Sequence, residues 1–311
     1  MHRKLFNSRC FSLALAANAL LAGVVAAEEL WVAKPFTPEG DFTPGIEGPN
    51  CDAAGNLFAV NYAREGTIGR VTPDGKAEVF VELPLGSSGK QSVGNGIVFN
   101  PNGTMYVADY VNHNVLQIDP RTRKIRVFAH DDRFYQPNDL AIAPDGSLYC
   151  SDPDWSTGNG QLWHVDAAGK ATRVAEHLGA TNGIEVSPDG KTLYVNESKQ
   201  LGVWAFPILA DGGLTQRKLV KQFADFGFDG MRSDVDGNLW IARYGKGTVV
   251  QLSSKGEVLR EVDVLGKQPS NVCFGGADGR TVYVTEVEHR RLVAFRVERP
   301  GLAWSRWPKS K

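Results

Sequence analysis

Short apolar runs separated by polar turns recur along this chain at a nearly constant spacing. The clearest copy is residues 181–196, where a polar residue leads a short apolar strand, an Asp-Gly turn follows, and a second β-rich run comes after the turn. This order predicts a β-hairpin. We call the polar residue that opens each copy a marker, with Asn182 as the reference.

Six markers divide the chain into repeats, 48, 43, 44, 47 and 42 residues apart, and a glycine lies eight residues after each. The markers are Glu47, Asn95, Asn138, Asn182, Asp229 and Asn271, and the glycines are Gly55, Gly103, Gly146, Gly190, Gly237 and Gly279. A period in the forties with several short strands per unit is typical of propeller blades. The pattern predicts an all-β fold, a six-bladed β-propeller with four-stranded antiparallel blades around a central channel.

Two N-terminal stretches lie outside the repeat. The β-rich run at residues 30–36 is predicted to add an outer strand to the last blade and so close the ring. Residues 1–27 place basic residues before an apolar run that ends in small residues, which indicates a secretory signal. A retained membrane anchor is the alternative, but it needs ~20 apolar residues. We therefore expect a signal peptide at 1–27, one propeller domain at 28–311, and a periplasmic or secreted protein.

Charge and cysteine content narrow the classes of partner. The chain has 34 Lys and Arg and 35 Asp and Glu, and loss of residues 1–27 would remove three of the basic ones. A weakly acidic chain gives no reason to expect nucleic acid or an anionic membrane as partner. Cys51, Cys150 and Cys273 would remain, and strand alternation predicts that Cys51 and Cys273 do not face each other. We expect buried free thiols.

The markers are the candidate chemistry. In a propeller the innermost strands begin on one face around the channel, so the six marker side chains are expected to converge there. All six carry side-chain oxygen, and such a set without His or Cys suits a hard cation. The alternative is that Asn-Gly at 95 and 182 and Asp-Gly at 229 only satisfy turn chemistry.

Three loops could border such a site. The Gly/Ser-rich segment 85–90 is predicted to be a solvated connection, with a lid as the alternative. The loops at 110–113 and 154–155 could border the site, but structural roles are the preferred interpretation for each. The six histidines recur at no shared position of the repeat, so they are interpreted as surface or packing residues.

Four motifs in this order resemble the gluconolactonase/regucalcin (senescence marker protein) family of six-bladed propellers. They are Glu47-Gly48-Pro49, Pro137-Asn138-Asp139-Leu140, Thr181-Asn182-Gly183-Ile184 with Ser187-Pro188-Asp189-Gly190, and Asp229-Gly230-Met231. The resemblance spans residues 47–295. It implies a metal-dependent carboxylic ester hydrolase that opens a sugar lactone to the aldonic acid.

The resemblance also implies roles for single residues. Glu47, Asn182 and Asp229 would be ligands of one divalent cation, Ca²⁺ in the first place, with Mg²⁺, Mn²⁺ or Zn²⁺ as alternatives. Asn138 would contact the metal and face the lactone, with Gln136 and Asn95 as further substrate-binding residues. Animal regucalcins carry Arg where this chain has Gln136, so sugar binding by that route differs here.

Asp229 is the candidate catalytic residue. A carboxylate beside the metal can take the proton from an attacking water as a general base, and direct covalent attack by Asp229 is the rival mechanism. Two other functions stay open at the level of the sequence. One is a non-catalytic NHL-like interaction propeller, and the other is a metal-dependent phosphotriesterase, because fold and metal do not fix the substrate.

Overall fold

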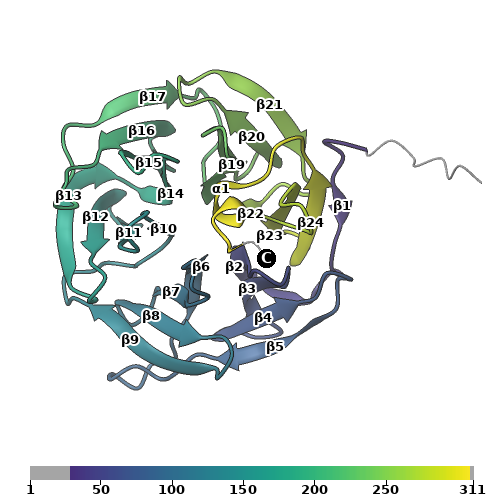
Figure 1. The fold of residues 1–311 in the computed structure, drawn as a ribbon, viewed down its shortest axis with the longest axis horizontal. Helices are drawn as coiled ribbons and strands as arrows, with labels where there is room; N and C mark the ends of the chain where they lie inside the picture. Colours follow the sequence, from purple (N-terminus) through teal and green to yellow (C-terminus); the bar gives the residue numbers. More distant parts are fainter. Residues whose placement is uncertain (1–28, 309–311) are drawn as a thin grey trace, which may run out of the picture.

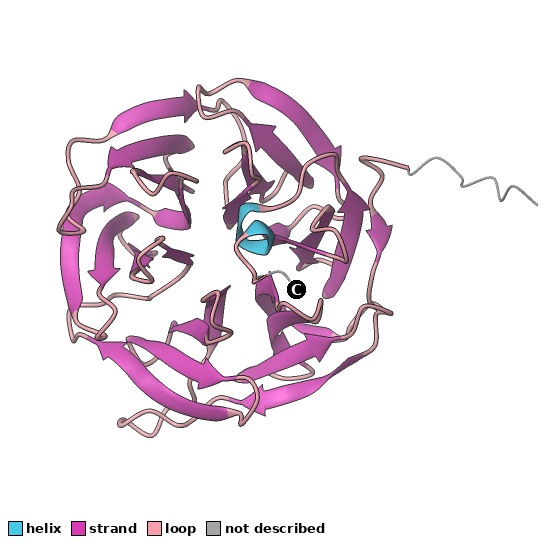
Figure 2. Ribbon diagram, in the orientation of Figure 1, coloured by secondary structure: helices cyan, strands magenta, loops and turns pink. Residues whose placement is uncertain are grey.

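The structure, a computed structural model, describes residues 29–308 and forms a ring of six antiparallel sheets with four strands each. Figure 1 shows the sheets arranged as blades around a central channel, and Figure 2 shows strands joined by loops and turns with one short helix. This confirms the predicted propeller. The predicted signal at 1–27 lies outside the described residues. No helix among residues 29–308 is long and apolar enough to cross a membrane.

Each blade takes its four strands from one sequence repeat, except the last. The first blade consists of β2 (Phe42–Cys51), β3 (Leu57–Tyr62), β4 (Thr67–Val71) and β5 (Ala77–Glu82). The second consists of β6 (Gly94–Phe99), β7 (Met105–Asp109), β8 (Asn114–Asp119) and β9 (Lys124–His130). The third consists of β10 (Leu140–Ile142), β11 (Leu148–Asp154), β12 (Asn159–Val165) and β13 (Ala171–Gly179). The fourth blade consists of β14 (Thr181–Val186), β15 (Thr192–Glu197), β16 (Gly202–Pro207) and β17 (Lys218–Gln222). The fifth consists of β18 (Met231–Ser233), β19 (Leu239–Arg243), β20 (Thr248–Leu252) and β21 (Val258–Asp263).

The sixth blade closes the ring with a strand from the start of the chain. It consists of β22 (Pro269–Gly275), β23 (Thr281–Glu286), β24 (Arg291–Arg296) and β1 (Lys34–Pro35). Lys34 pairs with Ala294, and the nearby Trp31 ring stacks on Trp240 with centroids 5.8 Å apart. The run at residues 30–36 therefore supplies the outer strand that the sequence predicted.

The turns between first and second strands need a left-handed residue, and the repeated glycine supplies it. All six glycines that lie eight residues after a marker have φ between 72° and 92°, which residues with a Cβ rarely adopt. These turns lie on the face opposite the markers. On that face the short helix α1 (Leu302–Ser305) lies over the channel, where Figure 1 shows it in yellow.

The hydrophobic core consists of six clusters, one at each interface between neighbouring blades. At the seam between the sixth and first blades, Cys51 and Cys273 belong to the same cluster, and contact with the Cys273 thiol raises the pKa of Cys51. The prediction of buried free thiols is confirmed for the described cysteines. The prediction that these two point apart was wrong, because the blades pack face to face and bring facing side chains together.

Candidate functional site

A cavity of about 590 Å³ lies on the face of the ring where the innermost strands begin. Connections between second and third strands form its upper walls. Five of the six markers line it, namely Glu47, Asn95, Asn138, Asn182 and Asp229. Residues more than 180 positions apart in sequence therefore share one site, as expected from the repeat.

The residue after a marker is often glycine because the next blade packs against it. A Cβ on Gly183 would lie 2.4 Å from the backbone oxygen of Asp229, and one on Gly230 would lie 1.9 Å from the side chain of Asn271. Neither glycine has a positive φ. The Asn-Gly and Asp-Gly pairs are thus sites of close backbone approach, and the turn interpretation was wrong. The close approach holds the marker side chains against one another around the cavity.

Glu47 lies in the cavity wall with its carboxylate held from two sides. Its Oε2 accepts a hydrogen bond from the backbone N–H of Gly48 (2.6 Å) and another from Nδ2 of Asn271 (2.9 Å). Burial raises the pKa of Glu47 to about 7, although the Asn271 hydrogen bond opposes that rise. The Glu47 carboxylate is therefore oriented by two neutral donors, and neither of them supplies a positive charge.

Asp229 is the second carboxylate of the cavity. Burial raises the pKa of Asp229 well above its usual range, and the nearby charge of Glu47 raises it further. A hydrogen bond with Asn182 opposes these effects. Two adjoining carboxylates repel each other unless a proton or a cation lies between them.

Two amide oxygens at the cavity have no partner. Oδ1 of Asn95 and Oδ1 of Asn182 are buried, and within residues 29–308 nothing donates to them. Asn182 is fixed from its other end, because Nδ2 donates to the Ser198 hydroxyl (3.0 Å), which donates to the carbonyl of Phe228 (2.6 Å). Buried acceptors normally have a partner. Two such amide oxygens with two carboxylates form the oxygen-rich set that a hard divalent cation requires, so the residues fit one.

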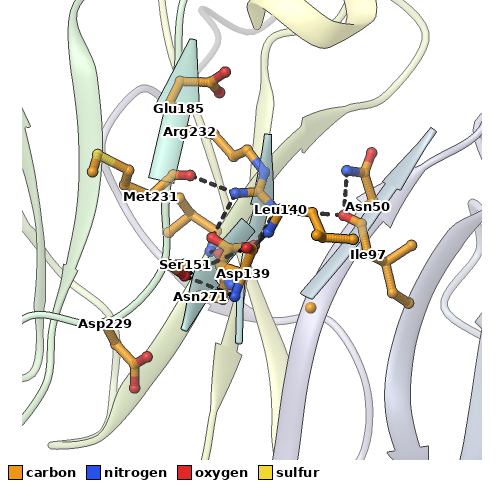
Figure 3. Close-up of polar contacts among 12 residues, drawn as sticks. Asn50, Ile97, Asp139, Leu140, Ser151, Glu185, Asp229, Met231, Arg232 and Asn271 are labelled. Atoms are coloured by element: carbon orange, nitrogen blue, oxygen red, sulfur yellow. Dashed lines mark hydrogen bonds and ion pairs between the residues drawn. The ribbon is translucent and has the colours of Figure 1, made fainter. Parts of the chain in front are cut away.

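A buried ion pair lies deeper in the channel. Arg232 donates from Nη1 to Oδ2 of Asp139 (2.8 Å) and from Nη2 to Oδ1 (2.9 Å), and Figure 3 shows its guanidinium directed at Asp139. Burial alone would lower the pKa of Arg232, but the Asp139 carboxylate raises it above the ordinary value. The Asp229 carboxylate points away from Arg232 in the same view. Arg232 thus neutralises Asp139 and leaves the cavity carboxylates free.

Aromatic side chains line the upper part of the cavity. Tyr110 follows β7, Trp155 follows β11 and Tyr244 follows β19, so three blades each contribute one ring through the same type of connection. All three are at least partly exposed, whereas Asn138 and Asn182 beside the carboxylates are buried. The cavity therefore has a polar floor and an apolar rim.

Residues 45–288 match the family model described as SMP-30/Gluconolactonase/LRE-like region. The chain belongs to this family. The resemblance noted in the sequence is thereby confirmed.

Relatives within this family carry lactonase names. A gluconolactonase of Zymomonas mobilis is 27% identical over 77% of this chain and 75% of its own length. A 6-deoxy-6-sulfogluconolactonase of Pseudomonas putida is 31% identical over 76% of this chain and 86% of its own length. A solved structure described as a calcium-binding protein, the regucalcin of Agrobacterium tumefaciens, superposes with a TM-score of 0.72 at 24% identity. That superposition covers 84% of this chain and 92% of the solved one, and it supports the fold.

Two residues that the sequence placed at the cavity, Gln136 and Asn271, do not line it. Gln136 lines a neighbouring hollow with His113 and Tyr135, and it is not among the residues that line the main cavity. Asn271 lies behind Glu47 and does not line the cavity, and its neighbour Ser270 takes the lining position in this blade. The side chain of the sixth marker therefore orients a carboxylate of the site.

Two of the three loops considered in the sequence line the cavity, and the third does not. Tyr110, Val111 and Trp155 line the cavity, although packing roles were weighed for their loops. The Gly/Ser-rich segment 85–90 does not line it. Within that segment the carbonyl of Gly86 accepts a hydrogen bond from the backbone N–H of Gly89, and the N–H of Gly86 donates to the carbonyl of Lys90. The Ser88 hydroxyl donates to Oδ1 of Asn112 (3.4 Å). These contacts fit the connecting loop that the sequence predicted.

Sequence reasoning missed the support of the site. Asp139 and Arg232 follow the markers Asn138 and Asp229 by one and three residues, and their opposite charges at equivalent inner strands were the available signal. Ser198 and Tyr244 had no such signal, since each lies in a loop of otherwise ordinary composition.

A second acidic cluster, Glu286 with Glu288 and His289, has oxygen and nitrogen atoms within 4.8 Å of one another. Oε2 of Glu286 already accepts from the backbone N–H (2.9 Å) and Nδ1 (2.8 Å) of His289. Oε1 accepts from the backbone N–H of Glu288 (3.0 Å). The carboxylate thus holds a loop together and offers little to a cation.

Proposed function

We propose that this chain hydrolyses a sugar lactone to the aldonic acid in the cavity formed by the markers. The observation that carries the proposal is the pair of adjoining carboxylates, Glu47 and Asp229, beside two unpartnered amide oxygens. The lactonase names of its relatives give the reaction class. An interaction propeller has no need for such a set of oxygens.

We infer that Glu47, Asn182 and Asp229 hold one divalent cation, with Asn138 and Asn95 beside it. Ca²⁺ is the first choice because all the donors are hard oxygens, with Mg²⁺, Mn²⁺ and Zn²⁺ as alternatives. When bound, such a cation supplies Lewis-acid stabilisation of the negative charge that develops on a lactone carbonyl oxygen.

The chain's own groups account for binding and proton transfer. The side-chain amides of Asn95 and Asn138 can donate to the oxygens of a bound lactone, and the Asn271 hydrogen bond keeps Glu47 in place. Asp229 accepts the proton of the water that attacks the carbonyl carbon, and the same proton can then pass to the departing ring oxygen. Burial and the nearby charge of Glu47 raise the pKa of Asp229 in the cation-free site, and a bound cation would favour the ionised form of Asp229, which is the form that can accept the proton.

Acid release at constant pH tests this proposal. A panel of aldonolactones is offered to the purified protein, to the chelated protein and to the chelated protein resupplied with each cation. We expect turnover that disappears with chelator and returns with cation, and a loss of at least about 10²-fold in Asp229→Asn. Turnover on no lactone, with no cation retained, would leave a binding propeller as the better account.

We also propose that the protein acts in the periplasm or outside the cell. The support is the basic and apolar pattern of residues 1–27, which ends in small residues before the first repeat of the propeller. N-terminal sequencing of the mature protein from fractionated cells tests this. A start near residue 28 is expected, and an intact Met1 in the cytoplasmic fraction would contradict it.

A further inference from the structure

The charge of the cavity lining is one-sided. Among residues 29–308, those that line the cavity include three carboxylates, Glu47, Asp229 and Glu65, and no Lys, Arg or His. A divalent cation would balance two of the three. One negative charge then remains in excess, and Glu65, which is exposed in the connection after β3, carries it at the rim.

Two cationic side chains close to residues of the cavity, Arg232 and Lys199, already have hydrogen-bond partners. Both terminal nitrogens of Arg232 are bonded to Asp139, so that pair is neutral. Lys199 reaches the outside of the rim, but its Nζ donates to the backbone carbonyl of Trp155 (2.6 Å), and Lys199 does not line the cavity. A phosphate, sulfonate or carboxylate on a ligand would therefore find no counter-charge on the wall.

The same rim offers apolar surface. Tyr110, Trp155 and Tyr244 come from three blades, and Val111 and Val287 lie among them. Aromatic faces pack well against the apolar C–H face of a sugar ring, and ligand cavities commonly combine such walls with a few polar groups that fix orientation. The polar floor would orient the lactone carbonyl while the rim packs against the remainder of the molecule.

We propose that the cavity selects neutral lactones and rejects those that carry an anionic group, and that Glu65 is a specificity-determining residue for this choice. This proposal rests on the proposed function insofar as it names lactones as the substrates. The selectivity itself is a preference for binding neutral sugars over anionic ones. It also separates this chain from its Pseudomonas putida relative, whose name specifies a sulfonated lactone.

Two measurements test the proposal independently of each other. The first compares kcat/KM for glucono-1,5-lactone and its 6-phosphate, which differ by one phosphate group; the Glu65 variants below separate the charge of that group from its size. The second uses ligand-observed NMR to compare binding of 1,5-anhydroglucitol and its 6-phosphate, which have no scissile bond, to the Ca²⁺-loaded protein. We expect the neutral member to be favoured at least roughly tenfold in both, with the preference reduced at high salt.

The variants assign the effect to Glu65. Glu65→Gln should reduce the preference and Glu65→Lys should abolish or reverse it. Glu257→Gln, at the other end of β20 from Tyr244, removes an exposed carboxylate on the opposite face and should leave the preference unchanged. Trp155→Ala should raise KM for the neutral lactone more than it lowers kcat.

The outcomes separate the two proposals. Neutral preference in binding with no hydrolysis of either lactone would sink the lactonase proposal and keep the selectivity. Hydrolysis of both lactones at similar kcat/KM, binding of neither anhydroglucitol, or a preference that Glu65→Lys leaves intact would overturn the selectivity. Tight binding of the phosphate that Lys199→Met removes would also overturn it, because Lys199 would then be the missing counter-charge.

Discussion

Nδ2 of Asn271 donates to Oε2 of Glu47 over 2.9 Å, across the seam where the last blade meets the first. The two residues are 224 positions apart in the chain. A site carboxylate is therefore oriented by the same contact that helps close the ring. Loss of that contact should affect both the affinity for a cation and the stability of the closed fold.

Asn271→Ala tests this coupling. Groups that orient a metal ligand typically contribute 10–100-fold to metal affinity, so we expect a loss of that size in Ca²⁺ affinity by calorimetry. Stability should fall by about 1–3 kcal/mol, because a buried acceptor loses a donor. Asn102→Ala, in an exposed turn, is the matched control. An unchanged Ca²⁺ affinity in Asn271→Ala would show that the hydrogen bond does not position Glu47.

The buried pair of Arg232 and Asp139 should be costly to break from one side only. Arg232→Met leaves the Asp139 carboxylate buried and unpaired, which typically costs 3–5 kcal/mol, measured by urea unfolding. The double variant with Asp139→Leu should recover most of that loss, since two apolar side chains replace both charges.

Arg299→Met is the control for that series, because it breaks the exposed pair of Arg299 with Asp236 and should leave the urea midpoint unchanged. A double variant no more stable than Arg232→Met alone would indicate that the pair acts through specific packing.

Stability of the cation-free protein should fall as pH rises from about 4.5 to 7. Burial raises the pKa of Glu47 from 4.5 to about 7, so the folded state holds a proton that the unfolded chain has lost in this range. That stabilisation is complete below pH 4.5 and is lost as pH rises through 7, and it is on the order of 3 kcal/mol. Asp229 shifts in the same direction.

Urea unfolding in chelator at pH 5, 6, 7 and 8 measures this trend. Glu47→Gln should reduce the slope of this trend, and added Ca²⁺ should offset it at pH 7 and 8, where the carboxylates are free to bind. Asp131 and Asp154 have pKa values lowered to about 2, so their effect lies at more acidic pH, whereas burial raises the pKa of Glu185 and Asp152 and adds to the same trend. Stability that instead rises across the window would contradict the raised pKa of Glu47.

The sequence could predict the blades because their turns repeat. A glycine eight residues after each marker is needed for a left-handed turn, and this local requirement is visible in one chain. The closing strand at residues 30–36 was equally predictable, because a β-rich run with no partner in its own repeat must pair elsewhere.

Other features depend on how blades pack, which no local pattern records. Asn271 lies behind Glu47 while its neighbour Ser270 lines the cavity, and Gln136 lies in a separate hollow although it is only two residues from Asn138. The contact between Cys51 and Cys273 likewise arises from the seam between two sheets. The sequence could predict that the markers converge at one end of the channel, but it could not predict the direction in which each side chain points.

Parallel measurement of cation occupancy and acid release tests the central claim most directly. The chelated protein is titrated with Ca²⁺ while glucono-1,5-lactone is hydrolysed at constant pH, and bound Ca²⁺ is counted in the same samples. The account predicts that activity rises linearly and saturates at one Ca²⁺ per chain, and that Asp229→Asn stays inactive throughout. Full activity in the cation-free protein, or an active Asp229→Asn, would contradict it.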